Sequence, residues 1–184
     1  VIPEQVSPND TAIYVVDKDK EQQFDLFLIN MKHKAIPDEM KVNMDYLLMK
    51  YMDNALTLML NTRFSEKAQE PDCPYLQAVG DNGDYLMSRT CGAFTLTGLA
   101  KEGQVKEAYA AVLREAKRAH DFGFTATEYQ RVKDEIKSQI EKSLANKDKM
   151  KNEQFTTQYV DHFIANEPIP SIEDESAILQ QLIP

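Results

Sequence analysis

The sequence has few cysteines and no long apolar run. Its only cysteines, Cys73 and Cys91, share no CxxC or histidine spacing. Two cysteines allow one disulfide but make no disulfide framework, and we expect two free, buried thiols. No apolar run reaches the ~18 residues that span a bilayer, so we expect no direct insertion into a membrane. The chain begins Val-Ile-Pro and not with Met, and we expect a fragment of a longer protein whose targeting signal would lie upstream.

Positive charge is also in deficit. The chain has 21 Lys and Arg against 30 Asp and Glu, which gives a formal net charge of −9 over 184 residues. A surface of this sign repels phosphate and therefore disfavours nucleic acid and anionic membranes as partners. The remaining composition, 42% hydrophobic and 28% charged, is typical of a globular protein. The length is enough for one domain with its own core.

Complete catalytic motifs are missing as well. The three histidines, His33, His120 and His162, lie far apart in the sequence, and neither HExxH nor HxxEH occurs. There is no GxSxG, no P-loop and no GxGxxG. The acidic run from Asp17 departs from an EF-hand loop, because Gln22 stands where that loop requires glycine. The residues thus predict no catalytic residue, no metal ligand and no cofactor in this chain.

What the sequence does contain is an ordered series of strand and helix patterns. A capping box at Thr125–Glu128 marks one helix start, and the run Gly80–Asp84 predicts a bulge or a hairpin turn. The apolar stripe of the long first helix is wide and predicts a largely buried helix. The strand at 24–31 is apolar on both faces, so we expect cover on both sides. Predicted strands are 11–16, 24–31, 75–79 and 89–99, and predicted helices are 37 to about 63, 105–123, 129–144, 155–163 and a short closing segment.

This order predicts an α+β fold, a two-layer domain in which a mainly antiparallel sheet of four to five strands packs against helices. Residues 1–10, rich in Pro, Asn and Ser, predict a linker that leads into the domain. Residues 11–167 are expected to form a single domain. Residues 168–184, which begin with two closely spaced prolines, are expected to form an exit segment toward a next domain.

Several short motifs follow one another in a familiar order. The segment Met59–Glu66 resembles the signature ML-x-x-R-L-x-E of the insulinase/pitrilysin/mitochondrial-processing-peptidase family of zinc metallopeptidases, in the domain that follows the HxxEH domain. The match covers about residues 11 to 184 and is carried also by 74–78, 94–98, 101–103, 122–129, 160–163 and 167–170. The exit segment is similar to that of large bacterial members.

The resemblance implies a metallopeptidase LuxS/processing-peptidase-like fold, several copies of which enclose a chamber. It implies zinc-dependent cleavage of peptides or unfolded polypeptide, with the zinc held in a catalytic domain that this chain lacks. The implied partners are polypeptide substrate and the other domains of the parent protein. The implied location is the bacterial periplasm or cell envelope.

Some domains of this type carry an Arg and a Tyr, seven residues apart, that hold the substrate. Ala68 or Gln69 stands at the place of that Arg, and Tyr75 falls about one residue from the place of the Tyr. The Arg/Tyr pair of the family is therefore broken or absent in this chain. The resemblance leaves Arg63 and Tyr75 as the candidate substrate contacts. For Arg63 the alternative is a salt bridge at the end of the helix.

Three functions remain open from the sequence. The first is a non-catalytic domain that lines a protease chamber and binds extended peptide at a sheet edge, for which the strand 75–79 is the candidate. The second is an inactive structural or assembly module of the same family. The third is a free-standing enzyme of another type.

Overall fold

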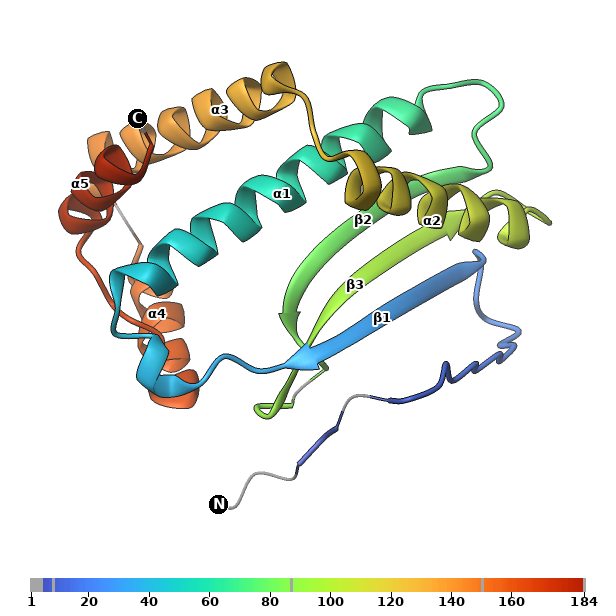
Figure 1. The fold of residues 1–184 in the computed structure, drawn as a ribbon, viewed down its shortest axis with the longest axis horizontal. Coiled ribbons are helices and arrows are strands. Elements are labelled where there is room, and N and C mark those ends of the chain that lie inside the picture. The colour runs from blue at the N-terminus through green and yellow to red at the C-terminus, as the bar shows by residue number, and fades with distance from the viewer. Residues whose placement is uncertain (1–4, 8, 87, 150, 184) are drawn as a thin grey trace. The chain divides into compact units, whose positions relative to one another are not determined.

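The computed structural model describes residues 5–7, 9–86, 88–149 and 151–183 (Figure 1). The chain divides into two compact units: the first contains residues 1–35 and 56–124, and the second contains 36–55 and 125–184. The helix α1, Met44–Ala68, contributes its first half to the second unit and its second half to the first.

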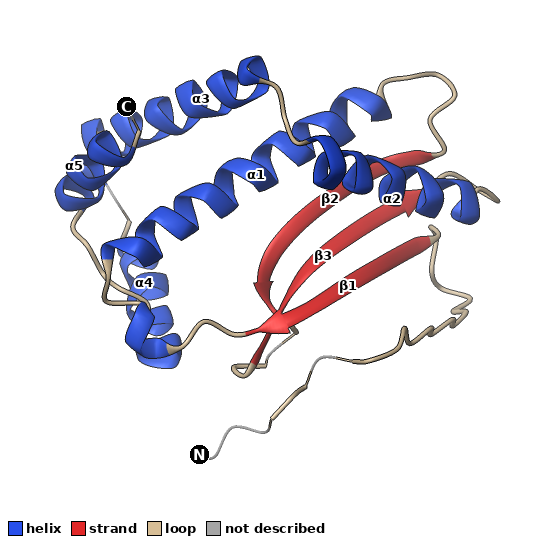
Figure 2. Ribbon diagram, in the orientation of Figure 1, coloured by secondary structure: helices blue, strands red, loops and turns tan. Residues whose placement is uncertain are grey.

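The first unit is a sheet with helices on one face (Figure 2). Its strands are β1 (Leu26–Lys34), β2 (Tyr75–Asp84) and β3 (Cys91–Ala100), which pair antiparallel in the order β1-β3-β2. The α+β class is confirmed. The described residues form three strands, fewer than the four to five expected.

The core of the first unit lies between the sheet and two helices, the second half of α1 and α2 (Val105–Phe122). The buried residues of α2 recur at helical spacing, and this single stripe faces the sheet. Each fully buried large aliphatic or aromatic side chain contributes ~1.5–3 kcal/mol of transfer free energy. The core residues are Phe27, Leu60, Phe64, Cys73, Tyr75, Ala78, Leu96, Ala100, Ala108, Ala111 and Val112.

A glycine in β3 allows an aromatic side chain of β1 to pack directly against the sheet backbone. The ring of Phe27 on β1 lies directly over Gly98 of β3, and a Cβ at position 98 would overlap that ring. The predicted bulge or turn at Gly80–Asp84 is wrong, because these residues continue β2 in register with β3. The irregularity in β2 lies instead between Tyr75 and Gln77.

Residues 11–16 are not a strand in the structure, so that prediction is wrong. They make no ladder with the sheet, and Val16 is 96% exposed. The two faces of β1, both expected to be covered at least in part, are covered unequally by the described residues. Phe27 is buried against the helices, whereas Leu26 and Leu28 on the opposite face are 51% and 54% exposed.

The second unit is helical. It comprises the short 3-10 helix η1 (Asp38–Met40), the first half of α1, and α3 (Ala126–Ala145), α4 (Asn152–Ala165) and α5 (Ile172–Leu182), with a 3-10 turn, η2 (Lys147–Lys149), after α3. α3 packs against α5. The long helix begins at Met44 and not at 37, because the residues after Pro37 form only a 3-10 turn.

Two helix starts in the second unit, those of α3 and α5, are capped by local side chains. The Thr125 hydroxyl accepts a hydrogen bond from the Glu128 N–H, and the Glu128 carboxylate accepts one from the Thr125 N–H. This is the predicted capping box, and it is confirmed. At the start of α5, the Ser171 hydroxyl accepts from the Asp174 N–H in the same way.

The apolar surface of α1 is less buried than predicted. One stripe, including Tyr51, Ala55 and Met59, is buried, as expected. A second stripe, rotated by about 100°, runs through Met44, Leu48, Met52 and Leu56, which are 37–54% exposed. The described residues therefore cover only part of the wide apolar surface that the sequence displays.

The turn after α4 is fixed by a cluster of charges around Glu167. Its carboxylate accepts hydrogen bonds at 2.7 Å from the Tyr46 hydroxyl and at 2.9 Å from Lys50 Nζ, and Lys41 Nζ lies 3.4 Å away. Burial alone would raise the pKa of Glu167, but Tyr46 and the two lysines outweigh it and lower the pKa below its usual value. The residue just before the predicted exit segment is thus tied to α1 and to the end of η1.

Candidate functional site

The outer edge of β1 presents unpaired backbone groups. The Ala100 N–H donates to the Asp25 carbonyl at 2.9 Å, which fixes the phase of the β1-β3 ladder. Because an antiparallel ladder alternates, alternate residues of β1 bond to β3 and the others face away from it. The residues with outward-facing N–H and C=O groups are Leu26, Leu28, Asn30 and Lys32. No strand among the described residues pairs with this edge.

Apolar side chains flank this edge on the face opposite the helices. Leu26 and Leu28 stand on this face together with Val79 of β2, which is 37% exposed. Farther along, Asn30 accepts a hydrogen bond from Thr95 at 2.9 Å, and Lys32 Nζ lies 4.4 Å from the centre of the Tyr85 ring. The edge thus combines backbone groups, an apolar end and a basic end.

The opposite edge of the sheet, on β2, is closed at its centre. Asn61 of α1 donates from Nδ2 to the Gly80 carbonyl at 3.0 Å and accepts at Oδ1 from the Gly80 N–H at 2.7 Å. Both groups are therefore occupied by one side-chain amide. A Cβ at Gly80 would meet Leu60 at 3.2 Å, so glycine lets α1 approach. A strand added along 75–79 would meet this contact at the next residue, Gly80.

Arg63 lies inside the first unit. Its Nη1 is 3.5 Å from Glu115 Oε1, its Nη2 donates to the Gly123 carbonyl at 3.1 Å, and its guanidinium lies 4.4 Å from the centre of the Phe124 ring. Gly123 ends α2 with a positive φ of 68°, where glycine carries no Cβ penalty. Arg63 therefore joins α1 to the C-terminal end of α2; it forms the salt bridge given as the alternative, but within α1, which continues to Ala68.

Tyr75 is completely buried, and its hydroxyl donates to the Phe64 carbonyl at 3.1 Å. Burial, together with the neighbouring Cys73 thiol, raises the pKa of Tyr75 well above its ordinary value, so this residue stays a neutral donor. The structure thus brings Arg63 and Tyr75 to the same turn of α1, both in internal contacts. Their contact with substrate stays a prediction. Cys73 and Cys91 are both free and buried, as predicted.

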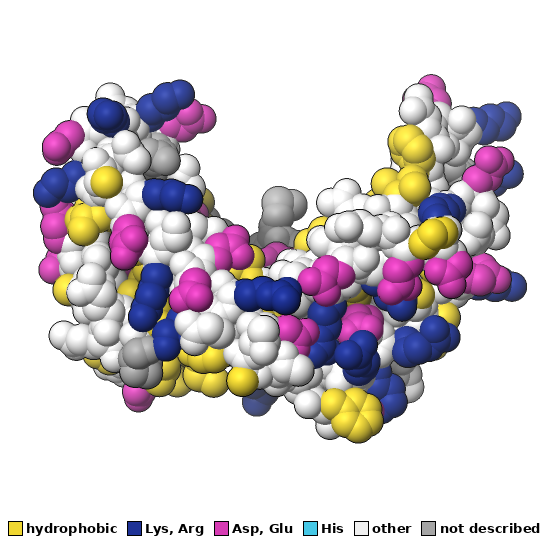
Figure 3. Space-filling model, turned by 90° about the horizontal axis from the view of Figure 1, so that it is seen from above, with side chains coloured by type: hydrophobic (Ala, Val, Ile, Leu, Met, Phe, Trp, Pro, Cys, Tyr) yellow, Lys and Arg dark blue, Asp and Glu magenta, His cyan; other side chains and the backbone are white. Residues whose placement is uncertain are grey.

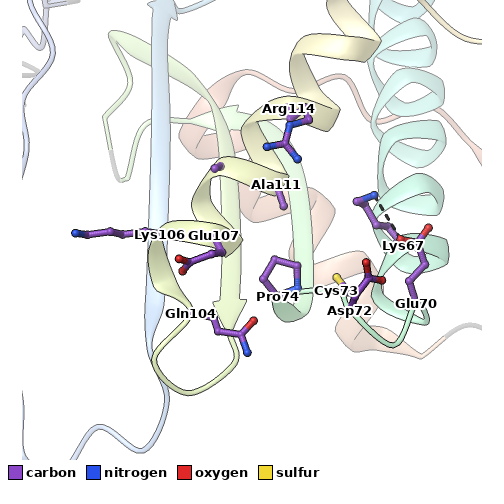
Figure 4. A pocket seen from close by; sticks show the side chains of 11 residues that line it. Lys67, Glu70, Asp72, Cys73, Pro74, Gln104, Lys106, Glu107, Ala111 and Arg114 are labelled. Carbon is purple, nitrogen blue, oxygen red and sulfur yellow. Dashed lines mark hydrogen bonds and ion pairs between the residues drawn. The ribbon is translucent and has the colours of Figure 1, made fainter.

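A shallow hollow of about 540 Å³ lies beside the N-terminal end of α2 (Figure 4). Cys73, Pro74 and Ala111 line it together with charged side chains of both signs. Lys67 and Glu70 at its border form an ion pair at 3.5 Å, and Arg114 lies across from them. This mixture of charges selects no particular ligand.

Each of the three histidines makes a separate polar contact. His33 Nε2 lies 2.9 Å from Asn82 Oδ1, His120 Nδ1 lies 3.0 Å from Asp121 Oδ1, and His162 Nδ1 lies 2.7 Å from the Glu167 carbonyl. No group of three or more His, Cys, Asp or Glu in the described ranges could hold a metal ion. The residues present therefore do not fit a zinc site.

Charge is mixed on the surface. On the face drawn in Figure 3, Lys and Arg side chains are interspersed with Asp and Glu and do not gather into a patch of one sign. In the part of the chain that the structure describes, no helix combines the length and apolar character needed to cross a membrane.

Asn61 and Gly80 were not identified from the sequence. Asparagine is a poor helix former in a helix interior, and Asn61 stands in the interior of α1. Glycine inside a strand often marks the close approach of another element. Together these two signals indicate a contact between a helix side chain and a strand backbone, although neither identifies the partner residue.

Comparison with known proteins places this arrangement in a fold class. No family model matches the chain, and no curated protein matches it in sequence. The periplasmic protease PqqL from Escherichia coli matches in structure with a TM-score of 0.77 and 15% identity over 89% of this chain and 18% of that protein. The structure of the first half of PqqL matches with a TM-score of 0.77 and 16% identity, over 89% of this chain and 34% of that one. A protein described as a predicted insulinase family protease from Yersinia pestis matches with a TM-score of 0.75 and 10% identity, over 90% and 35%.

The chain therefore has an insulinase-like fold, as its motifs led us to expect. It spans between 18% and 35% of the length of the solved proteins that it matches. At identities of 10–16% the likeness shows the fold, and any activity of those proteins is a proposal for this chain.

Proposed function

We propose that this chain is a non-catalytic domain of an insulinase-like zinc protease, which lines the substrate chamber and binds extended polypeptide along the outer edge of β1. The supporting observation is the asymmetry between the two sheet edges. The β1 edge offers outward-facing backbone groups at Leu26, Leu28 and Asn30, whereas Asn61 occupies those of Gly80 on β2.

Such an edge recognises the backbone of an extended chain. A peptide that adds as a strand exchanges N–H···O=C bonds with every second residue of β1. The flanking Leu26 and Leu28 side chains would cover its alternate apolar side chains. This mode suits an unfolded polypeptide of varied sequence, because the backbone groups are the same in every substrate.

Catalysis is assigned to another domain of the parent protein, which would hold the zinc and activate water. This chain contributes binding, and the other domains would complete the chamber. The fold is shared with a protein described as a periplasmic protease, and we propose the same compartment for this chain. Tyr75 of β2 holds α1 against the sheet through its bond to the Phe64 carbonyl, and Arg63 holds α1 against the C-terminal end of α2.

The test is the binding of a labelled peptide of alternating Val and Lys, nine residues long like β1. Fluorescence anisotropy should rise with chain concentration for the ordinary peptide. The same peptide with N-methyl groups on alternate residues cannot donate backbone hydrogen bonds along one edge. Its affinity should be lower by at least about tenfold, since each backbone bond contributes ~1 kcal/mol.

Equal binding of the two peptides would contradict recognition of the backbone. Absence of binding to either peptide would favour the alternative, an inactive structural module of the same fold.

A further inference from the structure

The side chains along the outer edge of β1 change from apolar to cationic. The four residues with outward-facing backbone groups also share the outer face of the sheet, since alternate residues of a strand point the same way. They are, in chain order, Leu26, Leu28, Asn30 and Lys32. In an antiparallel pair, directly opposed side chains stand on the same face. A peptide that adds to this edge therefore places every second side chain beside one of these four.

The first two positions form an apolar end. Leu26 and Leu28 are about half exposed. Leu26 opposes Leu99 of β3, so the apolar surface continues inward from the edge. An apolar side chain placed here is covered, whereas a charged one loses water without gaining a partner. This end therefore favours apolar residues such as valine.

The fourth position, Lys32, carries a positive charge that has only uncharged partners. Its Nζ lies 4.4 Å from the centre of the Tyr85 ring and donates to Asn9 Oδ1 at 2.9 Å. No Asp or Glu in the part of the chain that the structure describes forms an ion pair with it. Lys34, exposed and next on the same face, adds a second positive charge. The ring and the amide thus hold an ammonium group whose charge a carboxylate from another chain can neutralise.

The available edge stops at this basic end. His33 Nδ1 lies 2.9 Å from the carbonyl oxygen of Lys34, so the next outward-facing C=O group is already occupied. The side-chain oxygen of Asn30 accepts from Thr95 Oγ1 at 2.9 Å, which leaves the Nδ2 group of Asn30 to donate. Asn30 and Lys32 therefore offer donors side by side. A carboxylate matches them, because it only accepts hydrogen bonds.

The direction of the added strand decides where in the peptide the acidic residue stands. The strands of the described sheet pair antiparallel, and antiparallel pairs are slightly more stable per residue than parallel ones. A peptide antiparallel to β1 has its first residue opposite Lys32 and its later residues opposite Leu28 and Leu26. The acid therefore comes first and the apolar residues follow.

We propose that the β1 edge selects extended segments that run antiparallel to it, with Asp or Glu opposite Lys32 and apolar residues opposite Leu28 and Leu26. The inference rests on the proposed function, because it specifies the substrate of the same edge. The backbone bonds hold any extended chain, and the outer-face side chains rank one chain above another.

Two labelled peptides of equal composition and opposite order test the direction. The acid-first peptide, Glu-Thr-Gln-Thr-Val-Thr-Val, places Glu opposite Lys32 and its two Val opposite Leu28 and Leu26. The acid-last peptide, Val-Thr-Val-Thr-Gln-Thr-Glu, is the control, and both are acetylated and amidated so that no terminal charge contributes. In an antiparallel pair the acid-last order puts Glu beside Leu26 and Val beside Lys32. In fluorescence anisotropy the acid-first peptide should bind about tenfold more tightly, and high salt should reduce the difference.

Charge variants locate the preference. Lys32→Gln should reduce it to about threefold or less. Lys106→Gln is the matched control and should keep it, because Lys106 is exposed on α2, which packs on the opposite face of the sheet. Lys32→Glu should reverse the choice, so that a peptide with Lys in place of Glu binds more tightly than the acid-first peptide. A preference that survives Lys32→Gln in full would overturn the assignment to Lys32.

The outcomes separate this inference from the function on which it rests. If the Val/Lys peptide binds and the two ordered peptides bind equally, the edge binds polypeptide without this preference, and the inference alone is wrong. If no peptide binds, the proposed function is contradicted and the inference with it. Tighter binding of the acid-last peptide would indicate a parallel strand and overturn the stated direction. Tightest binding of Val-Thr-Val-Thr-Gln-Thr-Gln with a free C-terminal carboxylate would assign the basic end to a chain terminus and overturn the proposal.

Discussion

The side-chain amide of Asn61 spans both backbone groups of Gly80, donating to its carbonyl at 3.0 Å and accepting from its N–H at 2.7 Å. A helix side chain thus takes the place of a neighbouring strand at the middle of β2. Exposed edge strands invite pairing with other chains, and this contact interrupts such pairing at Gly80 of β2. It leaves β1 as the edge available for strand addition.

Replacing Asn61 by alanine should destabilise the first unit by ~1–3 kcal/mol, because the buried N–H and C=O groups of Gly80 lose their partners. Thr62→Ala is the matched control, since Thr62 is exposed on the same helix and bonds only within it, to Leu58. Urea unfolding measures both. A loss in the free energy of unfolding for Asn61→Ala no larger than that for Thr62→Ala would show that water replaces the two hydrogen bonds of Asn61.

Two arginines share Glu115, and we predict very different energies for them. Arg63 is 9% exposed at its side chain and Arg118 is 62% exposed, while both lie 3.5 Å from the carboxylate. Arg63→Ala leaves a buried carboxylate and should cost ~3–5 kcal/mol. Arg118→Ala removes a solvated pair and should cost less than ~1 kcal/mol. Similar losses for the two variants in urea unfolding would contradict the burial assigned to Arg63.

Stability of the second unit should fall in acid because of Glu167. The pKa of Glu167 is lowered in the folded state, so the folded state binds this proton less readily than the unfolded state. The stabilisation is present above the ordinary pKa of about 4.3 and is lost as the pH falls through the lowered folded value. Glu167→Gln should flatten this dependence in unfolding measured at several pH values. An unchanged slope would contradict the role given to the cluster.

The capping box of α3 gives a smaller, local prediction. Thr125→Ala removes the acceptor of the Glu128 N–H and should cost ~1 kcal/mol, whereas Thr125→Ser keeps the hydroxyl and should cost much less. Thermal unfolding of the two variants compares them directly. Equal losses would mean that the methyl group of Thr125, and not the bond, matters.

The sequence predicted those features that depend on local chemistry. Thr125 and Glu128 mark a helix start because both partners lie within one turn, and Gly123 marks a helix end because the left-handed conformation favours glycine. The helix and strand patterns around them carried the α+β class and the family resemblance. Both thiols were expected to be buried, and they are.

Features that depend on distant partners were missed. Residues 11–16 have strand composition, but a strand also needs an edge that accepts it, and no local pattern reports on that. Gly80 looked like a turn because its reason for being glycine is the approach of α1 from elsewhere in the sequence. The apolar stripe through Met44 and Met52 showed that a surface was apolar, but not which part of it the chain would cover.

Peptide binding by two variants of one residue tests the central proposal most directly. Leu28→Pro removes the outward-facing N–H of β1 without removing a bond to β3, because that N–H points away from β3. Leu28→Ala removes the same side chain and keeps the N–H. We predict that, in fluorescence anisotropy with the Val/Lys peptide, Leu28→Pro weakens binding about tenfold relative to Leu28→Ala. Equal affinities for the two variants would contradict peptide binding along the backbone edge of β1.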